Sequence, residues 1–148
     1  MPASGRVLYG DVTGLIACLV VLALAGGFGL IWKRRNGQMS TPRTAGGDTL
    51  TAADLGGPLG GRATLVQFST AFCAPCRATR LILADVASQV DGVTHVEIDA
   101  ESHLDLVRKL DIRRTPTVLV LGADGRIARR ASGRPTKSDV LAAVSEVG

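Results

Sequence analysis

Two cysteines separated by two residues, Cys73 and Cys76, are the side chains of this 148-residue chain best suited to chemistry. They follow a β-type run at 64–69 and precede apolar residues at helical spacing over 77–90. This order places both thiols at the first turn of a helix, where free N–H groups and the helix dipole stabilise a thiolate. We therefore expect the pKa of the first thiol to lie below the roughly 8.5 of a free cysteine.

Such a pair can stay open as a dithiol or close into a small disulfide. In thiol–disulfide exchange Cys73 would attack a substrate disulfide, and Cys76 would then resolve the mixed disulfide. Half of a zinc site and an inert structural disulfide are the alternatives. Zinc needs four ligands, and the two histidines, His95 and His103, have a spacing that fits no zinc-finger pattern. We predict a redox pair that needs neither a metal nor an organic cofactor.

A second motif lies about forty residues further on. Pro116 stands directly before an apolar, β-branched run, and proline is tolerated there only at the start of a strand. With this motif the chain resembles the thioredoxin family over about residues 48–148. The resemblance rests on V-Q-F-S-T-A-F-C-A-P-C-R at 66–77, E-I-D at 97–99, I-R-R-T-P-T at 112–117, and Gly133 after the last expected strand.

The resemblance implies a fold, an activity and a substrate site. The fold is α/β and thioredoxin-like, with a mixed central sheet flanked by helices. The activity is protein-disulfide oxidoreduction, and the partners are protein disulfide substrates and a reductase or other thiol donor. A cis bond between Thr115 and Pro116 would pack against the disulfide, with Arg113 and Arg114 at the rim. The implied substrate groove consists of Phe72, Ala74, Pro75, Thr115 and Pro116.

Four positions depart from the family pattern. Phe72 replaces the usual tryptophan, and Ala74 replaces the glycine between the cysteines. Gln67 stands where the family has a buried aspartate that handles protons beneath the second cysteine, and His95 stands at a nearby lysine position. Glutamine forms hydrogen bonds but takes no proton near neutral pH. We expect His95 or water to handle the proton; the alternatives are a satisfied core amide for Gln67 and a plain strand residue for His95.

Residues 12–32 form an uncharged apolar run that predicts one N-terminal transmembrane helix. At about 1.5 Å per residue, this run spans roughly 30 Å, the hydrocarbon thickness of a bilayer. Trp32 lies at its end, where interfacial aromatic residues are common. A cleaved signal peptide is the alternative, because Ala23-Leu24-Ala25 has the shape of a cleavage site. The run continues past that site to Lys33-Arg34-Arg35, which favours an anchor in the lipid bilayer.

The basic residues beside this run predict its orientation. Only Arg6 precedes the run, whereas Lys33, Arg34, Arg35 and Arg43 follow it. The positive-inside rule then predicts a single-pass cell-membrane protein with its redox domain in the cytoplasm. The predicted organisation is a short tail at 1–11, the transmembrane helix at 12–32, a basic and flexible linker at 33–47, and the redox domain at 48–148.

Within the redox domain, strand and helix patterns alternate, as they do in an α/β sheet with helices on both faces. A capping-box sequence at Thr51–Asp54 starts a short helix. Ser102 is expected to cap a helix that ends at Leu110. The other expected elements are strands at 64–69, 93–99, 117–121 and 127–131 and helices at 77–90 and 136–147.

The net charge of +4 belongs to the N-terminal segment. Residues 1–47 hold five basic side chains and one acidic, whereas residues 48–148 hold twelve of each sign. No basic stripe interleaved with aromatic residues is present, so we predict no nucleic-acid partner. Two other functions stay open: a non-catalytic, membrane-tethered binding module, and an extracytoplasmic relative that serves cytochrome maturation or disulfide formation.

Overall fold

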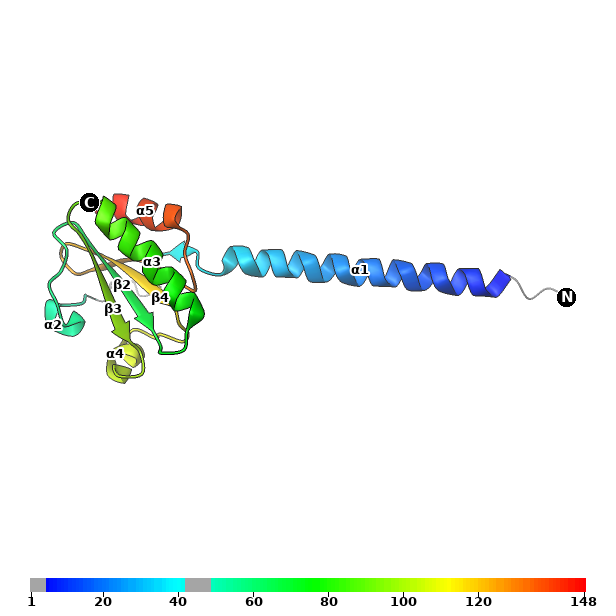
Figure 1. Ribbon diagram of the computed structural model, residues 1–148, viewed down its shortest axis with the longest axis horizontal. Coiled ribbons are helices and arrows are strands. Elements are labelled where there is room, and N and C mark those ends of the chain that lie inside the picture. Colours follow the sequence, from blue (N-terminus) through cyan, green and yellow to red (C-terminus); the bar gives the residue numbers. More distant parts are fainter. Residues whose placement is uncertain (1–4, 42–48) are drawn as a thin grey trace. The chain divides into compact units, whose positions relative to one another are not determined.

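The computed structural model describes residues 5–41 and 49–148, with side chains from residue 12 onward (Figure 1). It divides into two units, residues 1–35 and 36–148.

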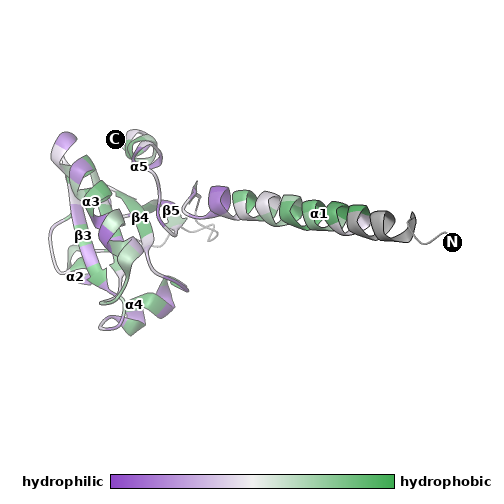
Figure 2. Cartoon of the chain, turned by 45° about the vertical axis from the view of Figure 1, so that its right-hand side comes forward, coloured by the Kyte–Doolittle hydropathy of each residue, from purple (hydrophilic) through white to green (hydrophobic). Residues whose placement is uncertain are grey.

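The first unit is built around one helix, α1 (Gly5–Arg35). Its stretch Val12–Arg35 is long and apolar enough to cross a membrane, and its large apolar side chains are exposed. Figure 2 shows this hydrophobic stretch ending in hydrophilic residues. A helix of this composition near the N-terminus serves as an anchor or as a signal sequence. The helix α1 continues beyond the predicted transmembrane segment on both sides, through residues 5–11 and 33–35, and the bounds of the span itself stay a prediction.

The second unit contains a mixed five-stranded sheet in the order β1-β5-β4-β2-β3. The strands β2 and β3 are parallel, and every other neighbouring pair is antiparallel. This sheet confirms the predicted α/β architecture. The strands are β1 (Met39–Ser40), β2 (Ala63–Ser69), β3 (Val93–Asp99), β4 (Thr117–Gly122) and β5 (Ile127–Ser132).

Helices cover both faces of this sheet (Figure 1). Side chains alternate between the faces of a strand, so Leu65 and Gln67 of β2 share one face, whereas Val66 and Phe68 share the other. The helices α3 and α5 pack on the Leu65 face, and α2 and α4 pack on the Phe68 face. The helices are α2 (Ala52–Leu55), α3 (Ala74–Gln89), α4 (Leu104–Lys109) and α5 (Lys137–Ser145).

The predicted flexible linker at 33–47 is wrong for residues 36–41. Met39 and Ser40 pair with β5, and the Gly37 N–H donates to the Ser132 carbonyl at 3.0 Å. The pairing partners lie about ninety residues away, so no local pattern announces this strand. Residues 42–48 of the linker lie outside the described residues.

Two helix starts also differ from expectation. The helix α3 begins at Ala74 rather than at 77, because the Cys73 sulfur accepts the Cys76 N–H and a proline fits the first turn. The helix α4 begins at Leu104 with His103, not Ser102, at the cap position. The Ser102 hydroxyl instead donates to Asp99 in the turn after β3. The predicted capping box of α2 is confirmed, with Thr51 and Asp54 bonded to each other's backbone.

Candidate active site

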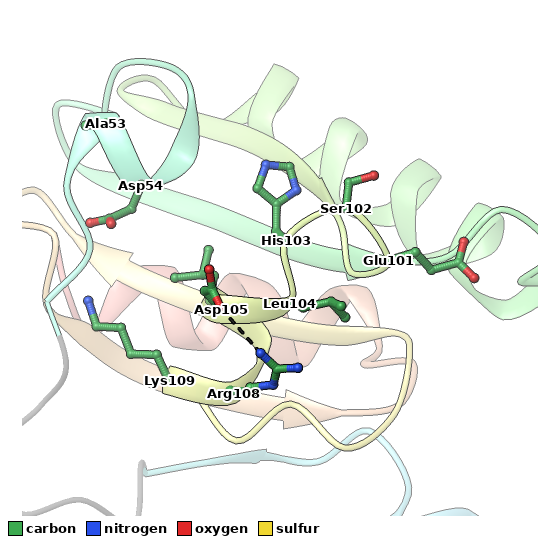
Figure 3. A pocket seen from close by; sticks show the side chains of 10 residues that line it. Ala53, Asp54, Glu101, Ser102, His103, Leu104, Asp105, Arg108 and Lys109 are labelled. Atoms are coloured by element: carbon green, nitrogen blue, oxygen red, sulfur yellow. Dashed lines mark hydrogen bonds and ion pairs between the residues drawn. The ribbon is translucent and has the colours of Figure 1, made fainter.

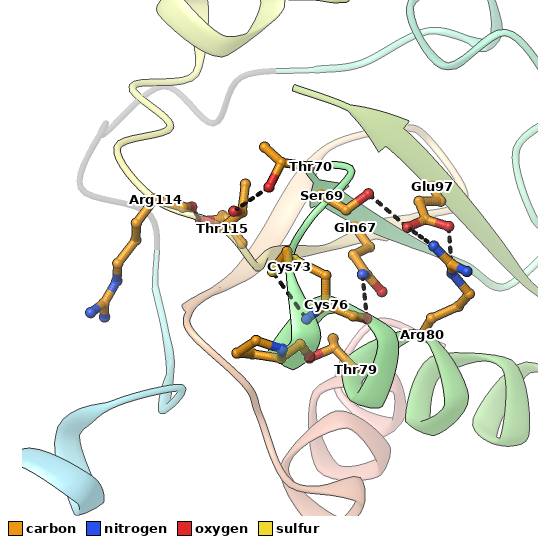
Figure 4. Close-up of a disulfide and its surroundings, with 12 residues drawn as sticks. Gln67, Ser69, Thr70, Cys73, Cys76, Thr79, Arg80, Glu97, Arg114 and Thr115 are labelled. Carbon is orange, nitrogen blue, oxygen red and sulfur yellow. Dashed lines mark hydrogen bonds and ion pairs between the residues drawn. A yellow bond between two sulfur atoms is a disulfide. The ribbon is translucent and has the colours of Figure 1, made fainter. Parts of the chain in front are cut away.

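A disulfide joins Cys73 and Cys76 at the start of α3 (Figure 4). Cys73 occupies the N-cap, and its sulfur accepts the Cys76 N–H at 3.1 Å. Cys76 is buried, with 1% of its surface exposed, whereas Cys73 is half-buried. The two sulfurs therefore differ in access: a substrate can reach Cys73 more easily than Cys76. This asymmetry suits a pair in which one thiol attacks and the other resolves.

The predicted groove residues come from two segments that lie together beside the disulfide. Phe72 is fully exposed, and Ala74 and Pro75 are exposed in the first turn of α3. The Thr115–Pro116 bond is cis, as the family resemblance implied. The hydroxyl of Thr70, in the loop after β2, lies 3.4 Å from the Thr115 hydroxyl, which joins the two segments. Their role in holding substrate stays a prediction.

The two arginines predicted at the rim have partners within the domain. The Arg113 guanidinium pairs with Asp111 at 2.9 Å. The Arg114 guanidinium donates to the carbonyl of Ser132 at 2.6 Å, so it links the segment before Pro116 to the end of β5. Both arginines are exposed.

Gln67 lies fully buried on β2, on the face that α3 covers. Its Nε2 donates to the Cys76 carbonyl at 2.9 Å, so the amide ties the sheet to the first turn of α3. Among the described residues, its Oε1 has no hydrogen-bond partner. The expectation of a satisfied core amide is thus met for the nitrogen only. Most buried polar atoms in folded proteins have a hydrogen-bond partner, and one without a partner lowers the stability of the fold. The Gln67 Oε1 is such an atom.

An ionised carboxylate lies one strand away from Gln67. Glu97 pairs in register with Gln67 and accepts hydrogen bonds from Ser69 at 2.6 Å and from Arg80 at 2.7 Å (Figure 4). Burial alone would raise the pKa of Glu97, but the bonds from Arg80 and Ser69 and the Arg80 charge hold it below its ordinary value. Glu97 was not among the predicted site residues. The register of β2 against β3 is the signal that would have found it.

His95 lies two residues before Glu97 and half-buried on the same strand. Burial lowers the pKa of His95, and the Arg80 charge lowers it further against the opposing pull of Glu97. The ring is therefore neutral at neutral pH. Its Nε2 is buried without a partner among the described residues. The structure thus places a neutral imidazole on the strand beside Gln67, while its role in proton handling stays a prediction.

A hollow lies between α2 and α4, away from the disulfide (Figure 3). Its lining includes Asp54, His103 and the ion pair of Asp105 with Arg108, whose atoms are 3.4 Å apart. Neither active-site cysteine lines it. Within residues 5–41 and 49–148, no three His, Cys, Asp or Glu side chains are grouped to hold a metal ion.

Comparisons with known proteins agree with the fold and the cysteine pair described above. The family model for thioredoxin matches residues 60–146. Thioredoxin C-2 of Corynebacterium nephridii is 30% identical over 83 residues, which cover 55% of this chain and 76% of that protein. Thioredoxin H5 of Oryza sativa subsp. japonica is 26% identical over 73 residues, which cover 49% of this chain and 54% of that protein. The match therefore spans only about half of the rice protein.

Solved structures agree with these sequence matches. The crystal structure of chloroplastic thioredoxin z superposes with a TM-score of 0.53 and 28% identity, over 59% of this chain and 79% of that one. A thioredoxin from Fasciola hepatica superposes with a TM-score of 0.53 at 21% identity, over 60% of this chain and 84% of that one. The second likeness concerns the fold alone.

Proposed function

Since this chain belongs to the thioredoxin family, we propose that it is a membrane-anchored thiol–disulfide oxidoreductase that reduces disulfides of protein substrates. One observation carries the proposal: the Cys73–Cys76 disulfide at the start of α3, with one accessible and one buried sulfur. A non-catalytic binding module would not need this pair.

The reaction follows from that asymmetry. In the reduced protein, the Cys73 thiolate attacks one sulfur of the substrate disulfide, and the other substrate sulfur leaves as a thiolate. Cys76 then loses its proton and attacks Cys73. The bond between Cys73 and the substrate breaks, and the second substrate sulfur leaves. Two electrons pass from the cysteine pair to the substrate, and an external thiol donor restores the dithiol.

The substrate groove is assigned to Phe72, Ala74, Pro75, Thr115 and Pro116. Phe72 offers a fully exposed aromatic ring, and exposed rings of this kind supply apolar area for docking. Thr115 lies at the contact with the Thr70 loop, beside the disulfide. An extended stretch of the substrate would dock between residues 72–75 and residues 115–116, with its disulfide facing Cys73.

The proton that Cys76 loses needs an acceptor other than Gln67. The amide of Gln67 is neutral and already donates to the Cys76 carbonyl. We assign the acceptor role to His95 or to water. Two observations support His95: its ring is neutral near pH 7, and its Nε2 is buried without a described partner.

The chain is anchored through residues 12–32, with its redox domain in the cytoplasm. The length and apolar composition of α1 support the anchor, and the basic residues Lys33, Arg34 and Arg35 at its end support the orientation. In a reducing compartment the pair would rest mostly as a dithiol and serve as a reductase. The domain is assigned to residues 36–148, because β1 belongs to its sheet.

The activity is tested by reduction of insulin disulfides with dithiothreitol as electron donor. The full chain should accelerate the reaction, and Cys73→Ser should abolish the acceleration. A Cys18→Ser variant is the matched control, because Cys18 is a free cysteine exposed on α1. An unaccelerated reaction with the native chain would support the binding module instead.

The compartment is tested separately in intact cells with a membrane-impermeant thiol reagent. A cytoplasmic domain leaves Cys73 unlabelled until lysis. Labelling before lysis would place the domain outside the cytoplasm and favour the role in cytochrome maturation or disulfide formation.

A further inference from the structure

The chain enters the redox domain at the same end of the strands as the disulfide. We call this end of the sheet the active-site edge. The strand β2 leads into Cys73 at its C-terminal end, and the antiparallel strand β4 begins at that end, directly after Pro116. The strand β5 returns there at Ser132, which pairs with Thr117. The first strand, β1, starts at this edge and runs away from it along β5.

The segment that leads into β1 is fixed to this edge by hydrogen bonds. The Gly37 N–H donates to the Ser132 carbonyl at 3.0 Å. The next residue, Gly133, donates its own N–H to the Pro116 carbonyl at 2.7 Å. The entering segment is therefore connected to the groove residue Pro116 through two hydrogen bonds and the peptide bond between Ser132 and Gly133.

Close packing adds to these bonds. Gly37 is buried at φ +88°, and a Cβ on it would clash with the carbonyl of Arg134. Gly133, at φ +106°, faces Asn36, and a Cβ there would clash with the Asn36 side chain. Both contacts require glycine for its conformation as well as its size. The entering segment is thus an integral part of the active-site edge and not a loose tether.

The other terminus lies at the opposite end of the domain. Gly148 approaches the Arg62 side chain, and the Arg62 N–H donates to Gly92 just before β3 begins. Both neighbours lie at the start of the parallel strands, away from Cys73. Figure 1 shows the C-terminus beside the last turn of α3, whereas the cysteines lie at its first turn. The N-terminal connection and the redox centre therefore share one end of this domain.

The active-site edge also carries arginines. Arg114 and Arg134 are exposed there beside the Arg113–Asp111 pair, and Arg34 and Arg35 precede the entering segment along the chain. Basic clusters beside a membrane segment are attracted to anionic lipid headgroups. This charge favours an edge that works close to a bilayer surface.

We propose that the redox centre acts on disulfides of membrane-bound proteins that lie close to the bilayer surface. This inference rests on the proposed anchor and activity and adds the partner class. The last residue of α1, Arg35, is joined directly to Asn36 at the active-site edge. With β1 paired from Met39, residues 36–38 span at most about 10 Å. A flexible tether of about twelve residues would instead give a mean distance of roughly 20 Å between the anchor and the domain.

The test uses the full chain, reduced beforehand and reconstituted in vesicles, in single turnover. The near probe is a transmembrane peptide with a disulfide-closed loop directly after its span. The far probe carries the same loop beyond twenty prolines, about 60 Å further out at roughly 3.1 Å per residue. A soluble peptide with this loop is the third substrate. We expect the near probe to be reduced at least tenfold faster than the far probe.

A matched variant removes only the positional constraint. Thirty Gly and Ser residues inserted between Arg35 and Asn36 leave β1 in place and extend the reach by roughly 30 Å. We expect the near-to-far ratio to fall below three, with an unchanged rate on the soluble peptide. A near-to-far ratio close to one in the native chain, or a high ratio that the insertion leaves unchanged, would overturn the inference.

Two readouts separate this inference from the proposed function. If the native chain fails to reduce the soluble peptide, or fails to float with the vesicles, then the activity or the anchor is wrong and the inference falls with it. If the chain floats and reduces the soluble peptide but treats both membrane probes alike, then only the partner class is wrong.

Discussion

The two cysteines should differ sharply in reactivity once the disulfide is reduced. We compare Cys76→Ser, which isolates Cys73, with Cys73→Ser, which isolates Cys76. Both variants carry Cys18→Ser, because Cys18 is free and would also be alkylated. The first variant keeps the backbone N–H of residue 76, which donates to the Cys73 sulfur at 3.1 Å. Its effect on Cys73 therefore survives the substitution.

The structure gives the expected size of the difference. A hydrogen bond to a charged group contributes about 1.5–3 kcal/mol. The N-terminus of the 16-residue helix α3 adds about 0.3–1 kcal/mol for an anion at its cap. Together they favour the Cys73 thiolate by about 2–4 kcal/mol, or roughly 30- to 900-fold in the ratio of thiolate to thiol. Since a free cysteine is a few per cent ionised at pH 7, Cys73 should be at least about half ionised there.

Cys76 lacks these advantages. It is 1% exposed, and burial in a low dielectric disfavours the charged form. Iodoacetamide alkylation between pH 5 and 9, with the labelled peptide identified by mass spectrometry, measures both thiols. We expect Cys73 to react at least tenfold faster than Cys76 at pH 7. Equal rates, or faster labelling of Cys76, would refute the assignment of nucleophile and resolving thiol.

Three further predictions concern the surroundings of the disulfide and the entering segment. Gln67→Leu removes the amide N–H that donates to the Cys76 carbonyl but also removes the unpaired buried Oε1, so the two effects oppose each other and the net loss of unfolding free energy should stay below about 1 kcal/mol, measured by urea titration in detergent; a loss above about 3 kcal/mol would contradict the cost assigned to that oxygen. Glu97 has a lowered pKa in the folded state, so it stabilises the fold above its unfolded pKa of roughly 4.3, and this stabilisation is lost as the pH falls further. Thermal unfolding from pH 6 to 3 should show a smaller loss for Glu97→Gln than for the native chain, and parallel curves would exclude this contribution. Gly37→Ala should expose β1 to hydrogen exchange by at least tenfold, whereas Gly57→Ala, where a Cβ meets open space, should leave β1 protected.

Local patterns predicted the elements whose causes are local. The strand β2 and the helix α3 follow from apolar spacing, and the capping box at Thr51 follows from two side chains three residues apart. The helix α3 starts three residues before the predicted position, because the sulfur of Cys73 caps it, and the usual capping side chains carry oxygen instead. At the turn after β3, Asp99 competed for the hydroxyl of Ser102 and left the cap of α4 without a side-chain bond.

Long-range contacts account for what the sequence did not predict. The strand β1 has two residues and no alternation, so only its pairing with β5 defines it. The requirement for glycine at Gly37 becomes visible only when the carbonyl of Arg134 is placed beside it. Glu97 entered the prediction as part of a family motif, but its neighbours Ser69 and Arg80 are known only from the register of two strands and the facing helix.

A single buried carboxylate beneath Cys76 could both hold the first turn of α3 and carry a negative charge. In this protein the two roles lie on different residues. Gln67 holds the first turn of α3 through an uncharged amide, so the side chain bonded to that turn carries no negative charge that would oppose a Cys73 thiolate. The negative charge lies instead on Glu97, one strand away, where it pairs with Arg80 at a site partly open to solvent; the two side chains are 26% and 50% exposed. An ion pair at such a site interacts weakly with a distant thiolate because solvent screens it. We therefore expect the exchange rate from pH 6 to 9 to follow the ionisation of Cys73 in one step. A Gln67→Asp variant should add a second step, because a carboxylate buried at that position titrates near neutral pH.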